Sequence, residues 1–439
     1  MDLLRVVGVR LSSVPPLTQS LLLAFAAAFG LIFSLTPRLP IVLFVLGALV
    51  PIWSIGALPP VLFDCARYGL AALLAVRLWT SNRPSARGLG SWVIPIMVTG
   101  LLVAIFGWLR GDAPTEGFIM AVAAFLAWAV ISKVDSPWPL FIGFASSVTV
   151  SAAVILTSAA GVAATAALAP NQNAGVARFT GLGSSAVRVS IELAVAIMIF
   201  IVAYKFRQGY RLVFLAGICL CAVALLVCGG RTGLFGLCLA LFVGFFRRWI
   251  GPLPAVLLAS GASIAIYQAT QDAGSGTFNT LDRIVGPIDE RYGGFTSGRS
   301  DLLAQEWSAF LESPLIGSGG GDAHFAPLYF AAKGGFLAGG IIVWLTGRLF
   351  LVLLRPAASL ANRPETAAAV LASAVFLAAA LVEPYGPFFG LEFLLLLFGG
   401  VGALAGPSAD LSARDSKRSV VLSGIASGQS QVRHVRSHS

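Results

Sequence analysis

Apolar residues dominate this chain in long, nearly unbroken runs, and short polar turns separate one run from the next. A helix needs about 20 apolar residues to cross the hydrocarbon core of a bilayer. Runs of about this length cover residues 17–35, 39–57, 61–79, 91–109, 117–134, 139–160, 187–204, 211–228, 232–246, 252–269, 334–354, 366–382 and 387–405. The pattern therefore predicts an all-α polytopic membrane protein.

Lys and Arg residues fall in alternate short loops, and this bias predicts the orientation of the spans. If the basic tail after residue 406 is cytoplasmic, each basic loop back to Arg38 falls on the same side. The alternation fails only at the N-terminus, because thirteen spans would place Arg5 and Arg10 outside. We therefore expect about twelve transmembrane helices with both ends in the cytoplasm.

Two long polar segments, 161–186 and 270–333, lie on the outer side of this arrangement. In the second, Ser300 can cap a helix that ends before Pro314. One face of this helix carries apolar residues, namely Leu303, Trp307, Phe310 and Leu311. The pattern predicts a short amphipathic helix at the membrane surface, within one large periplasmic loop.

The chain divides into three expected units. They are an N-terminal transmembrane bundle at 1–160, a membrane domain at 161–405 that contains the large loop 270–333, and a disordered cytoplasmic tail at 406–439. The tail is rich in Ser and Arg, a composition that cannot bury enough apolar surface to fold.

Composition excludes several classes of protein. Hydrophobic residues make up 57% of the chain and charged residues 11%, against about 45–50% and about 25% in soluble proteins. A soluble enzyme, a disordered protein and a secreted disulfide scaffold are therefore excluded. The net charge of +10 follows from basic cytoplasmic loops rather than from nucleic-acid binding. The five cysteines lie in or beside apolar runs as packing residues, and no Cys/His spacing predicts a metal or cofactor site.

Charged residues inside the predicted spans are candidates for function, because they are costly in a membrane. They are Asp64, Arg67, Glu192, Glu383 and Glu392, and all lie toward the outer ends of their spans. Two interpretations remain open. These residues are either interfacial groups and structural pairs, such as Asp64 with Arg67 at a helical spacing of three, or they line a water-filled cavity that opens outward.

Three Gly-Arg motifs also fall on the outer side. Arg231 stands at the start of a span, Arg178 precedes a span that begins near Arg188, and Arg299 lies in the large loop. Helix N-termini, glycines and arginines together suit a phosphate or pyrophosphate. The alternative is a set of tight turns with interfacial arginines. His324, the only histidine outside the tail, is either a general base near neutral pH or a surface residue.

The order of these motifs resembles the O-antigen ligase and O-antigen polymerase superfamily of bacterial inner-membrane proteins. Arg178-Phe179-Thr180-Gly181 is similar to its Arg-x-x-Gly stretch, and Gly230-Arg231-Thr232-Gly233 to its Ser-Arg-Thr-Gly motif. Gly298-Arg299-Ser300-Asp301, the segment Ser313-Pro314-Leu315-Ile316-Gly317-Ser318-Gly319 and His324 are similar to its large-loop signature. The chain departs from the family in Phe325 after the histidine, in Gly230, and in the lack of Asn-Pro-Asn at 183–186.

The resemblance implies a metal-independent, inverting glycan transferase with no cofactor, whose active site faces the periplasm. It would move a glycan from undecaprenyl pyrophosphate to a sugar hydroxyl of a second glycan or of lipid A–core. Its site residues would be Arg178, Arg231 and Arg299 on the pyrophosphate, His324 as the base, and Arg188, Glu192, Asp64, Glu383 and Glu392 as accessory residues. Membrane lipids and other polysaccharide-assembly proteins are further expected partners, and no nucleic acid is expected.

A different class of function is a transporter or flippase for lipid-linked glycans, without bond-forming chemistry. Such a protein would carry paired structural repeats and a site near the middle of the membrane. The sequence contains neither feature. A receptor or scaffold is a third class, and no sequence feature argues for it.

Overall fold

The structure, a computed structural model, describes thirteen stretches of the chain. They are residues 38–53, 60–81, 89–159, 168–171, 176–179, 181–183, 185–206, 208–228, 230–246, 299–320, 325–354, 364–383 and 388–405. The expected spans 17–35 and 252–269, the residue His324 and the tail 406–439 lie outside these stretches.

Twelve α-helices make up most of the described residues. Their bounds are α3 Leu39–Leu49, α4 Pro60–Thr80, α5 Gly90–Arg110, α6 Thr115–Ile131, α7 Trp138–Ala159, α8 Ala186–Phe206, α9 Arg211–Cys228, α10 Arg231–Phe246, α13 Arg299–Glu312, α14 Ala326–Leu354, α15 Pro364–Val382 and α16 Leu391–Ala405. A short antiparallel hairpin, β1 Leu168–Asn171 with β2 Val176–Phe179, precedes α8. The hairpin was not expected in an all-α chain, but it is a small departure from a helical fold.

Six of these helices are long and apolar enough to cross a membrane. They are Gly90–Arg110, Trp138–Ser158, Ala186–Phe206, Arg211–Cys228, Ala326–Leu354 and Pro364–Val382. Four shorter apolar helices, Leu39–Leu49, Thr115–Ile131, Thr232–Phe246 and Leu391–Val401, pack among them. The apolar helices indicate a multi-pass membrane protein, and the count of about twelve crossings stays a prediction.

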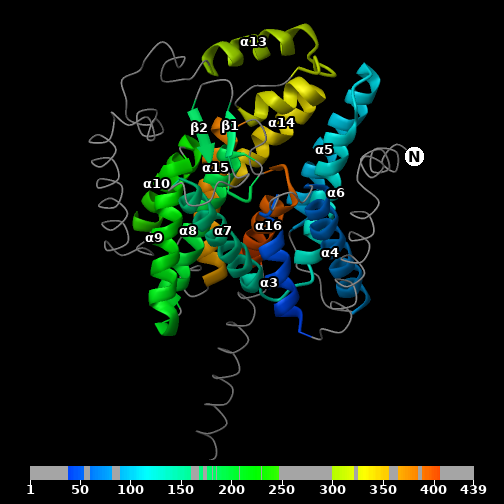
Figure 1. The fold of residues 1–439 in the computed structure, drawn as a ribbon. Helices are drawn as coiled ribbons and strands as arrows, with labels where there is room; N and C mark the ends of the chain where they lie inside the picture. Colours follow the sequence, from blue (N-terminus) through cyan, green and yellow to red (C-terminus); the bar gives the residue numbers. More distant parts are fainter. Residues whose placement is uncertain are drawn as a thin grey trace, which may run out of the picture.

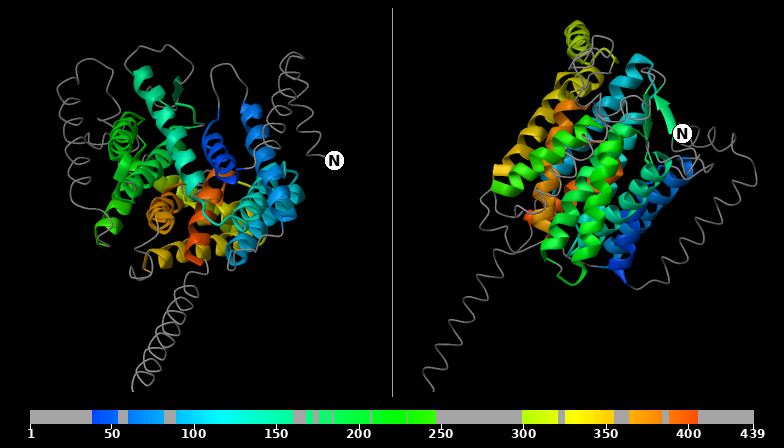
Figure 2. Two further views of the ribbon diagram at one scale, coloured as in Figure 1. Left: turned by 90° about the horizontal axis from the view of Figure 1, so that it is seen from below. Right: turned by 60° about the vertical axis from the view of Figure 1, so that its left-hand side comes forward.

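The long helices pack side by side as a bundle, with α13 lying across one end (Figure 1, Figure 2). We call this the α13 end. Helices α8 and α15 are buried along most of their length and form the centre of the bundle. Small residues let neighbouring helices approach closely, as is usual in membranes. At the contact of α5 with α6, for example, a Cβ on Gly117 would lie 2.3 Å from the carbonyl oxygen of Gly100.

Two predicted element bounds were wrong for identifiable reasons. Helix α3 ends at Leu49 rather than near residue 57, because Pro51 follows at once and proline cannot continue a helix. Helix α14 begins at Ala326 and has a break at Gly334 and Gly335. The apolar run that predicted a span from residue 334 marks only the part of α14 after this break.

Helix α13 confirms the predicted amphipathic segment before Pro314, although it begins at Arg299, one residue before the proposed cap Ser300. Leu303 and Trp307 are exposed on this helix, and Phe310 is half-buried. Glu306 is buried, at 8% exposure, which the sequence pattern did not predict. Its carboxylate oxygens lie 3.6 and 3.8 Å from the position that a Cβ on Gly320 would take.

Candidate functional site

A buried ionic cluster joins the N-terminal parts of α8 and α16. Arg188, in the first turn of α8, makes an ion pair with Glu392 at the start of α16. Its Nε atom also lies 3.6 Å from Oε1 of Glu192, one turn further along α8. Glu192 and Glu392 are 2% and 1% exposed. Two buried carboxylates therefore share one guanidinium group.

Trp53 links this cluster to a second arginine. The guanidinium carbons of Arg67 and Arg188 lie 5.2 and 5.9 Å from the centre of the Trp53 ring. Arg67 is 4% exposed, makes an ion pair with Asp64, and donates a hydrogen bond of 3.1 Å to the carbonyl oxygen of Val50. The pairing of Asp64 with Arg67 that their spacing indicated is confirmed.

Four of the five predicted accessory residues thus converge: Asp64, Arg188, Glu192 and Glu392. Arg67 and Trp53 complete the cluster: Arg67 was among the charged candidates but had no assigned role in the site, and Trp53 was not predicted. Arg67 and Arg188 are both held by carboxylates, so this cluster is a structural ion network rather than an open anion site. Such a network is stable only when each buried charge has its partner.

The fifth accessory residue, Glu383, lies at a different junction. It accepts a hydrogen bond from the hydroxyl of Thr232 in the first turn of α10, and both residues are buried. The amide of Gly233 donates a hydrogen bond of 3.2 Å to Oγ of Ser190 on α8. The first turns of α8 and α10 and the end of α15 therefore meet at one place.

The glycines of the Gly230–Gly233 motif serve helix packing. A Cβ on Gly230 would lie 2.1 Å from Cβ of Ser190, and a Cβ on Gly233 would lie 2.2 Å from its carbonyl oxygen. The sequence had suggested that these glycines let a ligand approach the backbone. The structure shows that they let α10 approach α8.

The structure gives the backbone positions of the three arginines that were predicted to bind pyrophosphate. Arg231 is the first residue of α10, and Arg299 is the first residue of α13. Arg178 lies in β2, paired with Ala169 of β1. Arg188 and Arg231 begin helices whose first turns pack together through Ser190. The meeting of these arginines around one anion stays a prediction, and His324 lies outside the described residues.

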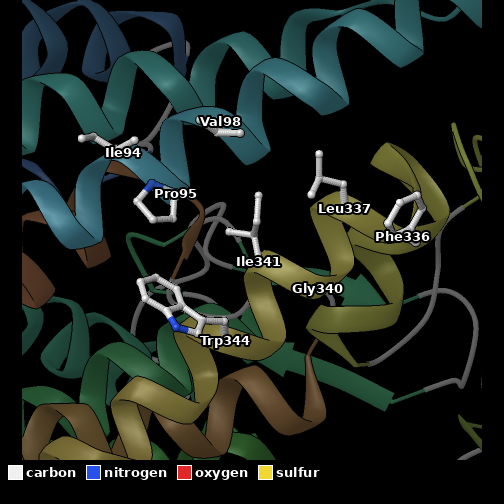
Figure 3. A pocket seen from close by; sticks show the side chains of 8 residues that line it. All are labelled: Ile94, Pro95, Val98, Phe336, Leu337, Gly340, Ile341 and Trp344. Atoms are coloured by element: carbon white, nitrogen blue, oxygen red, sulfur yellow. The ribbon is translucent and has the colours of Figure 1, made fainter.

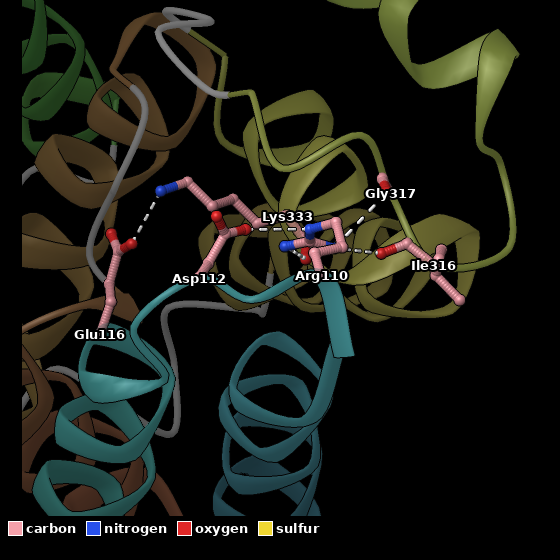
Figure 4. A network of polar contacts seen from close by, with 6 residues as sticks. All are labelled: Arg110, Asp112, Glu116, Ile316, Gly317 and Lys333. Atoms are coloured by element: carbon pink, nitrogen blue, oxygen red, sulfur yellow. Dashed lines mark hydrogen bonds and ion pairs between the residues drawn. The ribbon is translucent and has the colours of Figure 1, made fainter. Parts of the chain in front are cut away.

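Arg110 forms a further polar cluster that the sequence did not predict (Figure 4). It is the last residue of α5, and its guanidinium group donates to the carbonyl oxygens of Ile316, at 2.6 Å, and Lys333, at 3.0 Å. Its Nε atom donates to Asp112 at 3.1 Å. Beside it, Nζ of Lys333 lies 2.9 Å from Oε2 of Glu116, the first-turn carboxylate of α6.

Two apolar pockets flank α14. One, of about 600 Å³, lies between α5 and α14 and is lined by residues such as Ile94, Pro95 and Trp344 (Figure 3). The other, of about 500 Å³, lies between α13 and α14 and is lined by Trp307, Phe310 and neighbouring residues. Phe336 and Gly340 contribute to both. These surfaces suit the hydrocarbon chains of lipids and offer little to a polar ligand.

Comparison with known proteins adds no family to this description. A scan against protein-family models finds no match, and a search of curated proteins finds no relative. Among the described residues, no group of three or more His, Cys, Asp or Glu side chains is placed to hold a metal ion. The resemblance to the O-antigen ligase and polymerase superfamily therefore stays a prediction carried by sequence motifs.

Proposed function

We propose that this protein is a glycan transferase of the bacterial inner membrane, of the O-antigen polymerase or ligase type. It moves a glycan from undecaprenyl pyrophosphate to a sugar hydroxyl at the periplasmic face. One observation carries the proposal: the N-terminal turns of α8 and α10, each of which contains an arginine, pack together through Ser190. Helix N-termini and arginines together suit a phosphate group.

The N-termini of α8 and α10 suit an anionic donor. Their backbone N–H groups carry partial positive charge, and an arginine stands in the first turn of each, Arg188 in α8 and Arg231 in α10. Arg188 is already neutralised by Glu192 and Glu392. In this proposal Arg231 is therefore a donor ligand, together with Arg178 and Arg299, and Arg188 holds the helix that supports the site.

The transfer step follows from these roles. The acceptor hydroxyl oxygen attacks the anomeric carbon, and His324 takes the hydroxyl proton. The bond from the anomeric carbon to the pyrophosphate oxygen breaks, and undecaprenyl pyrophosphate leaves with the electron pair. Arginines stabilise the negative charge that grows on this leaving group. Attack opposite the leaving group inverts the anomeric centre.

The topology in this proposal puts the α13 end in the periplasm and gives the chain about twelve crossings. Lys133, Lys205 and Arg211 support this orientation, because they lie at the opposite end: Lys133 follows α6, Lys205 is in the last turn of α8, and Arg211 begins α9. Basic residues in short connections favour the cytoplasmic side.

The test uses the purified full-length protein with native lipid-linked repeat units, with and without lipid A–core. A ladder of products from repeat units alone would identify a polymerase. A shifted band that requires lipid A–core would identify a ligase. Transport of labelled lipid-linked glycan across liposomes, with no new glycosidic bond, would contradict the proposal and support the flippase alternative.

Three variants test the assigned roles. We expect Arg231→Ala and Arg299→Ala to abolish transfer while the protein still folds. We expect His324→Ala to lower kcat by about 100-fold or more while donor binding changes little. A variant that keeps normal transfer would remove its residue from the site.

A further inference from the structure

The guanidinium group of Arg110 holds together two pieces of chain that are far apart in sequence. From the end of α5 it donates to the carbonyl oxygens of Ile316 and Gly317, at 2.6 and 3.4 Å, in the turn that follows α13. It also donates to the carbonyl oxygen of Lys333, at 3.0 Å, in the first part of α14. One side chain therefore contacts three backbone acceptors on two segments.

The three carbonyl groups stand outside uninterrupted helix. That of Lys333 directly precedes the break in α14 at Gly334 and Gly335, where the helical pattern of backbone hydrogen bonds is interrupted. Those of Ile316 and Gly317 lie in the turn that follows α13. Backbone acceptors at such places are satisfied by side chains or by water, and here the guanidinium group of Arg110 is the donor.

The turn after α13 is fitted onto the break in α14 by further contacts. The amide of Phe336 donates to the carbonyl oxygen of Pro314 at 2.8 Å, and the amide of Gly319 donates to that of Ala332 at 3.0 Å. Gly335 has a φ of +72°, and a Cβ there would lie 2.0 Å from the carbonyl oxygen of Leu315. The two segments are thus in backbone contact, and Arg110 lies over their junction.

We propose that Arg110 is a positioning residue for the transfer reaction, an inference that rests on the proposed function. Arg110 fixes the turn at residues 313–320 onto the break in α14. This turn lies between α13, which begins with Arg299, and His324, four residues after Gly320 in the sequence. Arg110 thereby fixes the described turn to which α13 is joined and from which the chain continues to His324. It contacts no substrate itself.

The role requires arginine rather than another cation. The planar guanidinium group presents several N–H donors in a fixed fork, so it can serve Ile316 and Lys333 at once. A lysine ammonium at the same place is a single point of charge on a flexible stem. Arg110→Lys should therefore retain part of the transfer activity, and Arg110→Met should retain much less.

Arg348 offers a matched control on the same two helices. It lies on α14 toward its far end, and its guanidinium group donates to the carbonyl oxygen of Ser91 on α5 at 2.6 Å and to its Oγ at 3.1 Å. Arg348→Met thus removes an arginine that bridges α14 and α5, but away from α13. If Arg110→Met acted only by weakening the contact between α5 and α14, Arg348→Met should have the same effect.

The experiment measures amide hydrogen exchange and transfer kinetics on the full-length protein in lipid nanodiscs. For Arg110→Met we expect exchange at Gly317, Gly319 and Phe336 to be about tenfold faster or more. We expect kcat to fall by about 100-fold, as a small displacement of reacting groups can cause, with the donor KM nearly unchanged. Arg348→Met should leave exchange at these amides and kcat as in the wild type.

Three results would overturn the proposal. Unchanged exchange in Arg110→Met would show that Arg110 does not hold the turn. Faster exchange with a normal kcat would show that the contact is structural only. An equal loss of amide protection and of kcat in Arg348→Met would show that both variants act by weakening helix packing. If the wild type itself forms no glycosidic bond, the proposed function and the positioning role both fail, and the exchange data still decide whether Arg110 holds the turn.

Discussion

The two ends of the helix bundle differ in the burial of their carboxylates. At the α13 end, Glu192, Glu383 and Glu392 are buried, and Arg188 makes ion pairs with the first and the last of them. At the opposite end, the described acidic residues Asp135 and Glu365 are exposed and half-buried. Cations lie over aromatic rings at both ends, as Arg67 does over Trp53 and Arg348 over Trp92.

In the proposed function, this difference separates residues that anchor the protein at the membrane surface from residues near the reaction site. A cation beside a tryptophan ring at the edge of a membrane is an interfacial arrangement that tolerates change. A buried carboxylate tolerates little, because it must keep its partner. Glu192 and Glu392, at 2% and 1% exposure, therefore indicate that the α13 end is the specialised end of the molecule.

The largest expected effect comes from opening the buried ion network. Arg188→Met leaves Glu192 and Glu392 uncompensated, and loss of one partner from a buried pair costs about 3–5 kcal/mol of folding free energy. We expect a much lower midpoint of thermal unfolding for the purified protein in detergent. Arg211→Met, which removes an exposed arginine at the start of α9, should leave the midpoint nearly unchanged.

A double variant sharpens this prediction. Arg188→Met combined with Glu392→Met removes the cation together with one of its two carboxylates, so part of the lost stability should return. If the double variant is no more stable than Arg188→Met alone, the ion pair is not the source of the loss.

A smaller effect is expected where α10 contacts α8. Gly233→Ala forces a Cβ to within 2.2 Å of the carbonyl oxygen of Ser190, and overpacking of this kind costs about 1–3 kcal/mol. Gly347→Ala, toward the opposite end of α14, adds a methyl group with no atom within 4 Å. Unfolding midpoints of the two variants should therefore move apart, and equal midpoints would contradict the close contact at Gly233.

The smallest expected difference in stability is between variants of two buried threonines, Thr232 and Thr346. Thr232→Val removes the hydroxyl that donates to the buried carboxylate of Glu383 and should cost about 1–3 kcal/mol, whereas Thr232→Ser should keep most of the stability. Thr346→Val removes a buried hydroxyl that has no hydrogen-bond partner within the described part of the chain. That change should be neutral or stabilising. If Thr346→Val lost as much stability as Thr232→Val, the hydrogen bond to Glu383 would not be the source of the loss at Thr232.

Much of the fold could be predicted from the sequence because the apolar runs are long. The bounds of α5, α8 and α9 differ from the predicted spans by at most two residues. The break in α14 was missed because its two glycines, Gly334 and Gly335, stand at the edge of an apolar run and do not interrupt it.

The site was harder to predict than the fold. The pair of Asp64 and Arg67 follows from helical spacing alone. The pairing of Arg188 with Glu392 joins distant segments and depends on how α8 and α16 both pack against α15, which no local pattern encodes. Arg110 left no signal of its own, because its partners are backbone carbonyl groups. The clusters of glycines at 317–321 and at 334–335 were the available indication that two segments meet there.

The most direct test of the account compares transfer rates of two variants that change one arginine at each end. Arg231→Gln alters the first residue of α10 at the α13 end, and Arg348→Gln alters an arginine on the far part of α14. With lipid-linked repeat units as donor, we predict that Arg231→Gln loses transfer while Arg348→Gln keeps a rate close to that of the wild type. Normal transfer by a folded Arg231→Gln protein would contradict the assignment of the chemistry to the α13 end.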